Sequence, residues 1–331
     1  MRYRVLGRTG LRVSAIACGS NSLKAYSQEQ ANIAYNHAID KGVNLILTSA
    51  AYGSVESMIS EAVSHRRDDF YIATTTDHRS AEGAWRDIEN SLRVFKTGYI
   101  DVYQVGGIRD QEGVDKVFAS GGAMEALTKA RREGKVGYIG VTGHHFKALN
   151  NALKTGCFDT VLFFFNMARI HALDELFPIA KELNVGTLAM QPLSHGWLKP
   201  VDKALRFVLS SPVNVIVSGM YTPSMIDENT TVTEPEPTEE EWRSLLREAS
   251  AIDTGCRGGG CHSCLPCPRG NIDIPAIMNL INYKAKYGLQ PIGDAGWQSI
   301  VENAGKCNEC GLCERRCPYG LSIIPEIRRS I

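Results

Sequence analysis

Eight short apolar segments recur at regular intervals along the first 220 residues and alternate with amphipathic segments of helical period. Among these expected helices are Gln28–Lys41, Ser54–His65, Gly122–Glu133 and Leu173–Leu183. The expected strands are Val13–Cys18, Asn44–Thr48, Phe70–Thr75, Asp101–Val105, Val136–Val141, Thr160–Phe164, Gly186–Met190 and Val213–Val217. Short strands that each precede a helix are typical of a parallel sheet covered on both faces. Eight such units predict a (β/α)8 barrel, with chemistry on the loops that follow the strands. A doubly wound sheet is the alternative, but no Gly-x-Gly-x-x-Gly motif follows the first strand.

The two ends of this pattern indicate how the chain is divided. Tyr3–Leu6 and Leu11–Val13 flank a glycine-containing turn and predict a small hairpin that plugs the bottom of the barrel. Thr231–Pro237 is a linker rich in Pro and Glu, and Thr238 begins a capped helix after it. We therefore expect a barrel domain over residues 1–235 and a second domain over residues 236–331.

Composition excludes several classes of protein. Hydrophobic residues make up 44% of the 331 residues, which is enough for a sizeable core, and Lys+Arg and Asp+Glu number 36 each. Balanced charge gives no footprint for nucleic acid. No apolar run approaches the ~18 residues of a membrane span, and the first residues lack a secretory signal. The expectation is a soluble cytoplasmic protein that binds neither nucleic acid nor a membrane.

Eight of the ten cysteines fall between Cys256 and Cys317, and clustered cysteines without an export signal indicate metal ligands. Cys307, Cys310, Cys313 and Cys317-Pro318 follow the bacterial ferredoxin spacing, in which three thiolates bind one cluster and the fourth reaches a second.

The earlier run of cysteines serves the second cluster. Cys256, Cys261, Cys264 and Cys267-Pro268 form this run. By the ferredoxin pattern, one [4Fe–4S] cluster takes Cys256, Cys261, Cys264 and Cys317, and the other takes Cys267, Cys307, Cys310 and Cys313. Structural zinc is the alternative, because paired Cys-x2-Cys motifs also bind zinc, but zinc has no need of three closely spaced cysteines followed by Cys-Pro.

Several motifs in order resemble those of a known family. YRVLGRTGLRVSAIACG, AAYGSVESMISEAV, IGVTGH, ALRFVLSSPVNVIVSGM and IDEN are similar to segments of the aldo/keto reductases, in particular the branch that carries a C-terminal ferredoxin-like iron–sulfur domain. The resemblance covers nearly the whole chain. It implies a (β/α)8 barrel and an oxidoreductase that acts on a small molecule.

The resemblance also shows what the chain lacks. Members of the family reduce carbonyl groups with a nicotinamide cofactor and an Asp–Tyr–Lys–His tetrad. The tyrosine corresponds to Tyr52, but the other three positions correspond to Leu47, Thr75 and Gly106. A phenol with no ammonium group beside it is a poor proton donor near neutral pH. We therefore expect no turnover of common aldehydes with NADPH.

The nicotinamide site is weakened in the same way. Gly219, Met220 and Asn229 are the candidate cofactor-binding residues that match the family. Ser218–Thr230 contains no Lys or Arg that would bind a 2′-phosphate, so the sequence disfavours NADP and leaves NAD open. Leu162 and Met190 stand where many members have a glutamine and an aromatic residue that contact the nicotinamide.

Histidines after the strands are candidates for the missing acid–base groups. His144 and His145 follow the expected strand at Val136–Val141, and His195 lies in a segment where relatives tend to carry glycine. Imidazole titrates near neutral pH, so we predict Tyr52, His145 and His195 as catalytic residues. The plainer alternative is that these histidines only face solvent or cap loops.

Three functions remain open from the sequence. The favoured one is an iron–sulfur oxidoreductase that passes electrons to or from a small organic substrate at the barrel mouth, with a ferredoxin or another redox protein as partner. The second is an NAD(P)H-dependent carbonyl reductase with accessory clusters. The third is a non-catalytic electron-transfer or binding subunit.

Overall fold

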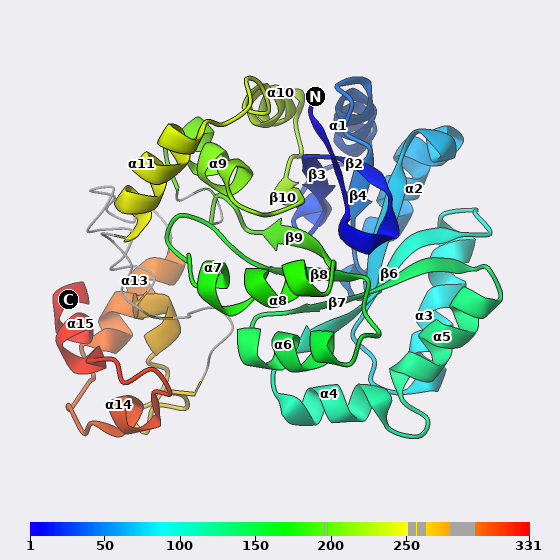
Figure 1. The fold of residues 1–331 in the computed structure, drawn as a ribbon. Coiled ribbons are helices and arrows are strands. Elements are labelled where there is room, and N and C mark those ends of the chain that lie inside the picture. Colours follow the sequence, from blue (N-terminus) through cyan, green and yellow to red (C-terminus); the bar gives the residue numbers. More distant parts are fainter. Residues whose placement is uncertain (195, 197, 251–255, 257–262, 279–294) are drawn as a thin grey trace.

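Eight parallel strands close into a barrel in the computed structural model (Figure 1). They are β3 (Ile16–Gly19), β4 (Leu45–Leu47), β5 (Tyr71–Thr76), β6 (Ile100–Ile108), β7 (Val136–Gly143), β8 (Thr160–Phe164), β9 (Gly186–Met190) and β10 (Val215–Gly219). Each strand pairs with the next, and β10 pairs with β3 to complete the barrel. The predicted (β/α)8 barrel is confirmed. The structure describes residues 1–194, 196, 198–250, 256, 263–278 and 295–331.

Helices between the strands cover the outside of the barrel. They are α1 (Gln28–Asp40), α2 (Val55–Val63), α3 (Ala81–Val94), α4 (Gln111–Phe118), α5 (Ala123–Arg132), α6 (Phe146–Lys154), α7 (Ala172–Glu175), α8 (Phe177–Glu182), α9 (Val201–Ser210) and α10 (Pro223–Thr231). Polar side chains begin several of them, because the first backbone N–H groups of a helix need acceptors. Ser27 forms a capping box with Gln30, Ser80 caps α3, and Asp110 caps α4.

Two expected elements differ from the structure for local reasons. The predicted strand Val13–Cys18 is two strands, because β2 (Arg12–Ser14) pairs with β1 (Tyr3–Val5) and only β3 joins the barrel. The predicted helix at Leu173–Leu183 breaks at Leu176 into α7 and α8. Pro178 explains the break, since proline has no N–H to donate and fits only in the first turn of a helix.

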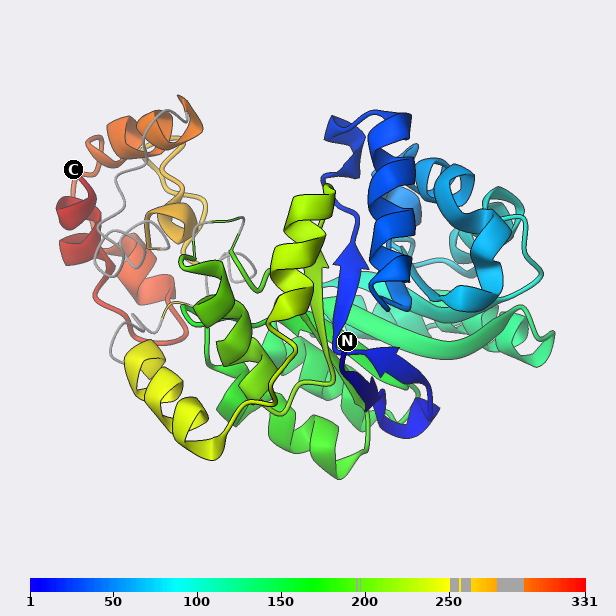
Figure 2. The ribbon, with the colours of Figure 1, turned by 90° about the horizontal axis from the view of Figure 1, so that it is seen from above.

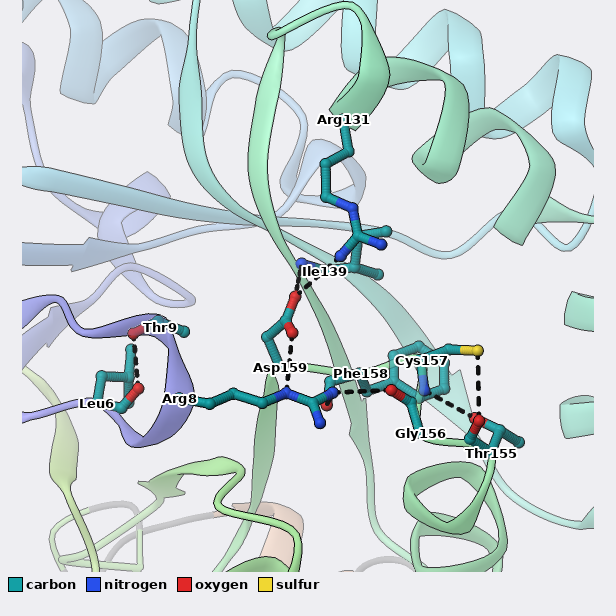
Figure 3. Close-up of polar contacts among 10 residues, drawn as sticks. All are labelled: Leu6, Arg8, Thr9, Arg131, Ile139, Thr155, Gly156, Cys157, Phe158 and Asp159. Carbon is teal, nitrogen blue, oxygen red and sulfur yellow. Dashed lines mark hydrogen bonds and ion pairs between the residues drawn. The ribbon is translucent and has the colours of Figure 1, made fainter.

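The β1–β2 hairpin closes the lower end of the barrel, as predicted. Leu6 and Val13 pack into the barrel interior with strand residues such as Leu45 and Leu188. Arg8 fastens the turn of the hairpin to the barrel, as Figure 3 shows: its Nε lies 3.0 Å from Asp159 Oδ1. The same carboxylate accepts a hydrogen bond from the backbone of Ile139. Charged contacts and apolar packing therefore both hold the hairpin.

A buried carboxyl group joins the helical layer to β5. Glu56 on α2 is only 3% exposed, and it accepts hydrogen bonds from Thr74 Oγ1 at 2.7 Å and Ser91 Oγ at 2.9 Å. Burial is the largest influence on this group and raises its pKa, and the two hydroxyl donors oppose the rise only in part. Glu56 therefore holds a proton more tightly in the folded than in the unfolded protein.

This difference predicts a pH dependence of stability. The raised pKa contributes its full stabilisation below the glutamate pKa of the unfolded chain, about 4.3. This part of the unfolding free energy is lost as pH rises through the higher pKa of the folded protein. Glu56→Gln keeps an acceptor for the hydroxyls and should remove this decline in unfolding free energy. Urea denaturation from about pH 4 to about pH 8 measures it, with Glu61→Gln on the exposed face of α2 as control. The same pH slope in wild type and Glu56→Gln would contradict the assignment.

The first helix after the barrel packs on the barrel. α11 (Glu239–Ser250) contacts α9, with Trp242 against Phe207 at 5.4 Å between ring centroids, and Thr238 caps its start.

The chain beyond α11 has a separate apolar core. α13 (Ala295–Ala304), α14 (Leu312–Arg316) and α15 (Ile323–Ser330) surround this core, which includes Ile274 and Ile327. We call the described residues 256, 263–278 and 295–331 the C-terminal module.

The module lies on one flank of the barrel. Figures 1 and 2 both place it on the side of α11, and in Figure 2 it extends toward the end of the barrel to which the β3 arrow points. Among the helices that the structure describes, none has the length and apolar character needed to cross a bilayer.

Candidate functional site: two thiol-lined cavities and the barrel mouth

The first cavity of the C-terminal module is lined by cysteines from both runs. It encloses about 330 Å³ of open space, bordered by Cys264, Cys267, Cys307, Cys310 and Cys313 together with Ile274 and Ile327. The backbone N–H of Glu309 donates to Cys307 Sγ at 3.5 Å. The loop that carries three of these cysteines turns at Gly311, whose φ of 70° suits glycine. The cavity contains all four cysteines that the sequence groups together for one cluster.

A second cavity adjoins the first. It encloses about 310 Å³ and is bordered by Cys256, Cys264 and Cys317, with Met278 and Ile323 as apolar walls. Cys264 and Ile274 border both cavities. Cys256, Cys264 and Cys317 are three of the four cysteines predicted for the other cluster. The fourth, Cys261, lies outside the described residues.

The donor set of each cavity suits an iron–sulfur cluster. Thiolates are the ligands of [4Fe–4S] clusters, and an apolar wall with N–H donors to sulfur is the environment in which such clusters are held. Within the described residues, the two cavities included, no three Cys, His, Asp or Glu side chains form a group that could hold a single metal ion.

The mouth of the barrel contains the candidate catalytic tyrosine. Tyr52 ends a short 3-10 turn (Ala50–Tyr52) after β4, and it is 37% exposed. Ser49 fixes this turn, because its hydroxyl accepts from Ala51 N and donates to the carbonyl of Thr75. Partial burial, followed by the charge of Asp77, raises the pKa of Tyr52. The phenol therefore stays protonated near neutral pH.

At the barrel mouth, a carboxylate lies beside the positions at which the family has a lysine and a histidine. A β-carbon built on Gly106 would lie 2.2 Å from Asp77 Oδ1 and 2.6 Å from the methyl group of Thr75. Asp77 therefore occupies the space into which a histidine at position 106 would extend. The pairing of β6 with β7 is irregular between Val105 and Ile108, so Gly106 lies in a bulge. Asp77 was not predicted as a site residue, although an acidic residue directly after β5 was a signal for it.

The candidate nicotinamide residues are mostly directed into the protein. Met220 is fully buried, and Asn229 is 2% exposed and donates from Nδ2 to Ser218 Oγ at 2.8 Å. Gly219 is exposed, but the Tyr221 hydroxyl lies 2.8 Å from its built β-carbon. Of the three residues, only Gly219 presents a surface that a cofactor could contact.

The histidine candidates that the structure describes lie on the loop after β7. His145 directly precedes α6 and is half-buried, and the ring of His144 lies 4.2 Å from that of Phe164 at the end of β8. The guanidinium of Arg169 lies 5.2 Å from the same phenyl ring. His195 lies outside the described residues.

Comparisons with known proteins identify both parts of the chain. Residues 15–203 match the model of the aldo/keto reductase family, and residues 255–322 match that of a 4Fe-4S dicluster domain, which implies iron–sulfur clusters. The chain is 27% identical over 220 residues to the uncharacterized oxidoreductase YqkF of Bacillus subtilis (strain 168), covering 62% of this chain and 69% of that protein. It is 28% identical over 217 residues to L-galactose dehydrogenase of Arabidopsis thaliana, covering 60% and 67%.

Solved structures share the fold. The aldo-keto reductase AKR11C1 from Bacillus halodurans (holo form) has a TM-score of 0.68 at 21% identity, over 75% of this chain and 96% of that one. An aldo-keto reductase from Klebsiella pneumoniae in complex with NADPH has a TM-score of 0.64 at 20% identity, over 75% and 95%. At this identity the likeness concerns the barrel alone. With the family match over more than half of its residues, the chain is an oxidoreductase that belongs to the aldo/keto reductase family and carries a 4Fe-4S dicluster domain.

Proposed function

We propose that this oxidoreductase uses two [4Fe–4S] clusters to pass electrons to or from a small organic substrate at the barrel mouth, beside Tyr52. The observation that carries the proposal is the pair of adjoining thiol-lined cavities in a chain whose tetrad positions hold Leu47, Thr75 and Gly106. When bound, the clusters supply one-electron transfer in place of the hydride transfer that the tetrad would support.

The cysteines divide into two ligand sets in this proposal. Cys267, Cys307, Cys310 and Cys313 hold one cluster, and Cys256, Cys261, Cys264 and Cys317 hold the other. Because Cys264 borders both cavities, little protein separates them. Cys310 is exposed, which favours the first cavity as the place where a ferredoxin or another redox protein exchanges electrons with the chain.

At the mouth, the chain itself supplies the proton. Tyr52 keeps its proton near neutral pH because burial and Asp77 disfavour the phenolate, which also makes it a weak acid. It would donate the proton only after the substrate has taken up an electron, because the reduced substrate is a much stronger base. His145 and His195 are the proposed groups that restore the proton. In Figure 2 the C-terminal module extends toward the end of the barrel to which the β3 arrow points. This position supports electron delivery at the barrel mouth.

The test is anaerobic purification followed by metal analysis. Iron and acid-labile sulfide should each approach about eight per chain, and Cys157→Ala, far from the two cavities in sequence, should leave both unchanged. Dithionite-reduced protein should then be reoxidised by a suitable member of a panel of aldehydes, enones and imines, and Tyr52→Phe should lose this reaction while it keeps its iron. Zinc at one or two per chain with little iron would overturn the proposal.

A further inference from the structure

The sign of the charge at the barrel mouth is reversed relative to the arrangement that the family resemblance implies. The positions for the lysine and the histidine hold Thr75 and Gly106, and the nearest atom to the β-carbon built on Gly106 is a carboxylate oxygen of Asp77. A lysine and a histidine together stabilise negative charge on a substrate oxygen. A carboxylate in their place opposes negative charge and stabilises positive charge.

The charge of Asp77 is only partly balanced by its neighbours. Among the described residues, no Lys, Arg or His nitrogen forms an ion pair with this carboxylate, and Asp77 is exposed. Arg79 is a neighbouring cation, and its Nη1 donates to the backbone carbonyl of Asp77 at 3.1 Å. Its Nη2 and Asp77 Oδ1 lie 3.3 Å and 3.8 Å from the β-carbon built on Gly107. Arg109 and Asp110, the other charged groups that influence Arg79, have opposite signs.

Aromatic rings accompany the carboxylate. Tyr52 is within electrostatic range of both Asp77 and Tyr221, and the ring of Tyr221 packs against that of Tyr26 at 5.0 Å between centroids. The faces of phenol rings attract organic cations, and more strongly where water is partly excluded. Tyr221 is largely buried whereas Tyr52 is 37% exposed, so the ring of Tyr52 is the more accessible of the two.

From this arrangement we infer that Asp77 makes the mouth selective for substrates that carry a positive charge near the reacting group, such as a protonated amine, and excludes carboxylates. The inference rests on the proposed function, because it names the substrate class for the same site. Asp77 acts here as a specificity-determining residue. The ammonium group would lie against its carboxylate and the tyrosine rings, while a carboxylate substrate would meet a like charge.

The experiment compares two probes of similar shape and opposite charge. Anaerobic holoprotein is titrated with benzylamine and with benzoate at neutral pH, and binding is followed by calorimetry and by the resonances of the mouth tyrosines. Benzylamine should bind and benzoate should not. Asp77→Asn should weaken benzylamine binding by about tenfold or more. Asp68→Asn, which removes an exposed carboxylate before β5 at the opposite end of the barrel, should leave it unchanged.

Charge reversal provides the second arm. Asp77→Lys should lose benzylamine and bind benzoate, a gain that a merely misfolded mouth would not produce. Equal binding of both probes by the wild type, no binding of either, or unchanged benzylamine binding in Asp77→Asn would each overturn the inference. Because these measurements need no electron transfer, a protein without clusters that still prefers benzylamine would refute only the proposed function.

Discussion

Alanine at both Cys267 and Cys310 should leave about half of the iron, roughly four atoms per chain, whereas alanine at both Cys310 and Cys317 should remove nearly all of it. The reason is the arrangement of the cavities. Cys267 and Cys310 border the same cavity although they come from different runs of the sequence, and Cys310 and Cys317 border different cavities although they lie in one run.

Iron and sulfide analysis of the two double variants, prepared side by side, measures this difference. Cys157→Ala serves as the control, because it removes a thiol that borders neither cavity. If the pair from one run kept half of the iron and the pair from one cavity lost it all, the ligand sets would follow the sequence runs and the crossed assignment would be wrong.

Gly7→Ala should lower the free energy of unfolding by about 3 kcal/mol or more. Two costs combine at this position. Its φ is 49°, in the left-handed region, and a β-carbon there would lie 2.3 Å from the backbone nitrogen of Gly186 at the start of β9. Backbone cannot move aside as a side chain can, so the hairpin would be displaced from the bottom of the barrel.

Gly10→Ala is the matched control in the same turn. Gly10 has a φ of 69°, but a β-carbon there would meet no atom within 4 Å, so it should cost only about 1 kcal/mol. Urea unfolding followed by far-ultraviolet circular dichroism distinguishes the two variants. Equal losses for both would mean that backbone conformation alone, and not the contact with Gly186, determines the cost.

The parts of the fold that follow from local patterns were predictable. The expected bounds of Thr160–Phe164 and Gly186–Met190 agree with β8 and β9, since both are apolar runs buried on both sides. The sequence predicted a hairpin strand at Leu11–Val13 before the barrel strand, but the boundary between β2 and β3 was not predictable from periodicity, because one continuous apolar run serves two sheets. The spacing of the cysteines predicts two ligand sets, which stay a prediction. Cys267, Cys307, Cys310 and Cys313 border one cavity, while Cys264 borders both cavities.

The mouth could not be predicted in the same way. The resemblance identified what positions 75 and 106 lack, but what fills the space depends on the bulge in β6 and on the turn after β5. Those are tertiary features, and Asp77 lies outside every motif that the family shares with this chain. Met220 and Asn229 point inward because of tertiary packing. Matching residues in two sequences cannot show this packing.

The packing of α11 on α9 determines where the chain can be divided. Leu245 and Ala249 belong to the same apolar cluster as the barrel helices, and Trp242 packs against it, so the helix that leads to the cysteines is part of the barrel's own core. A chain cut directly after residue 235 would lose the ring that packs on Phe207. A chain cut after α11 would keep both apolar cores, so the boundary between independent units lies after this helix.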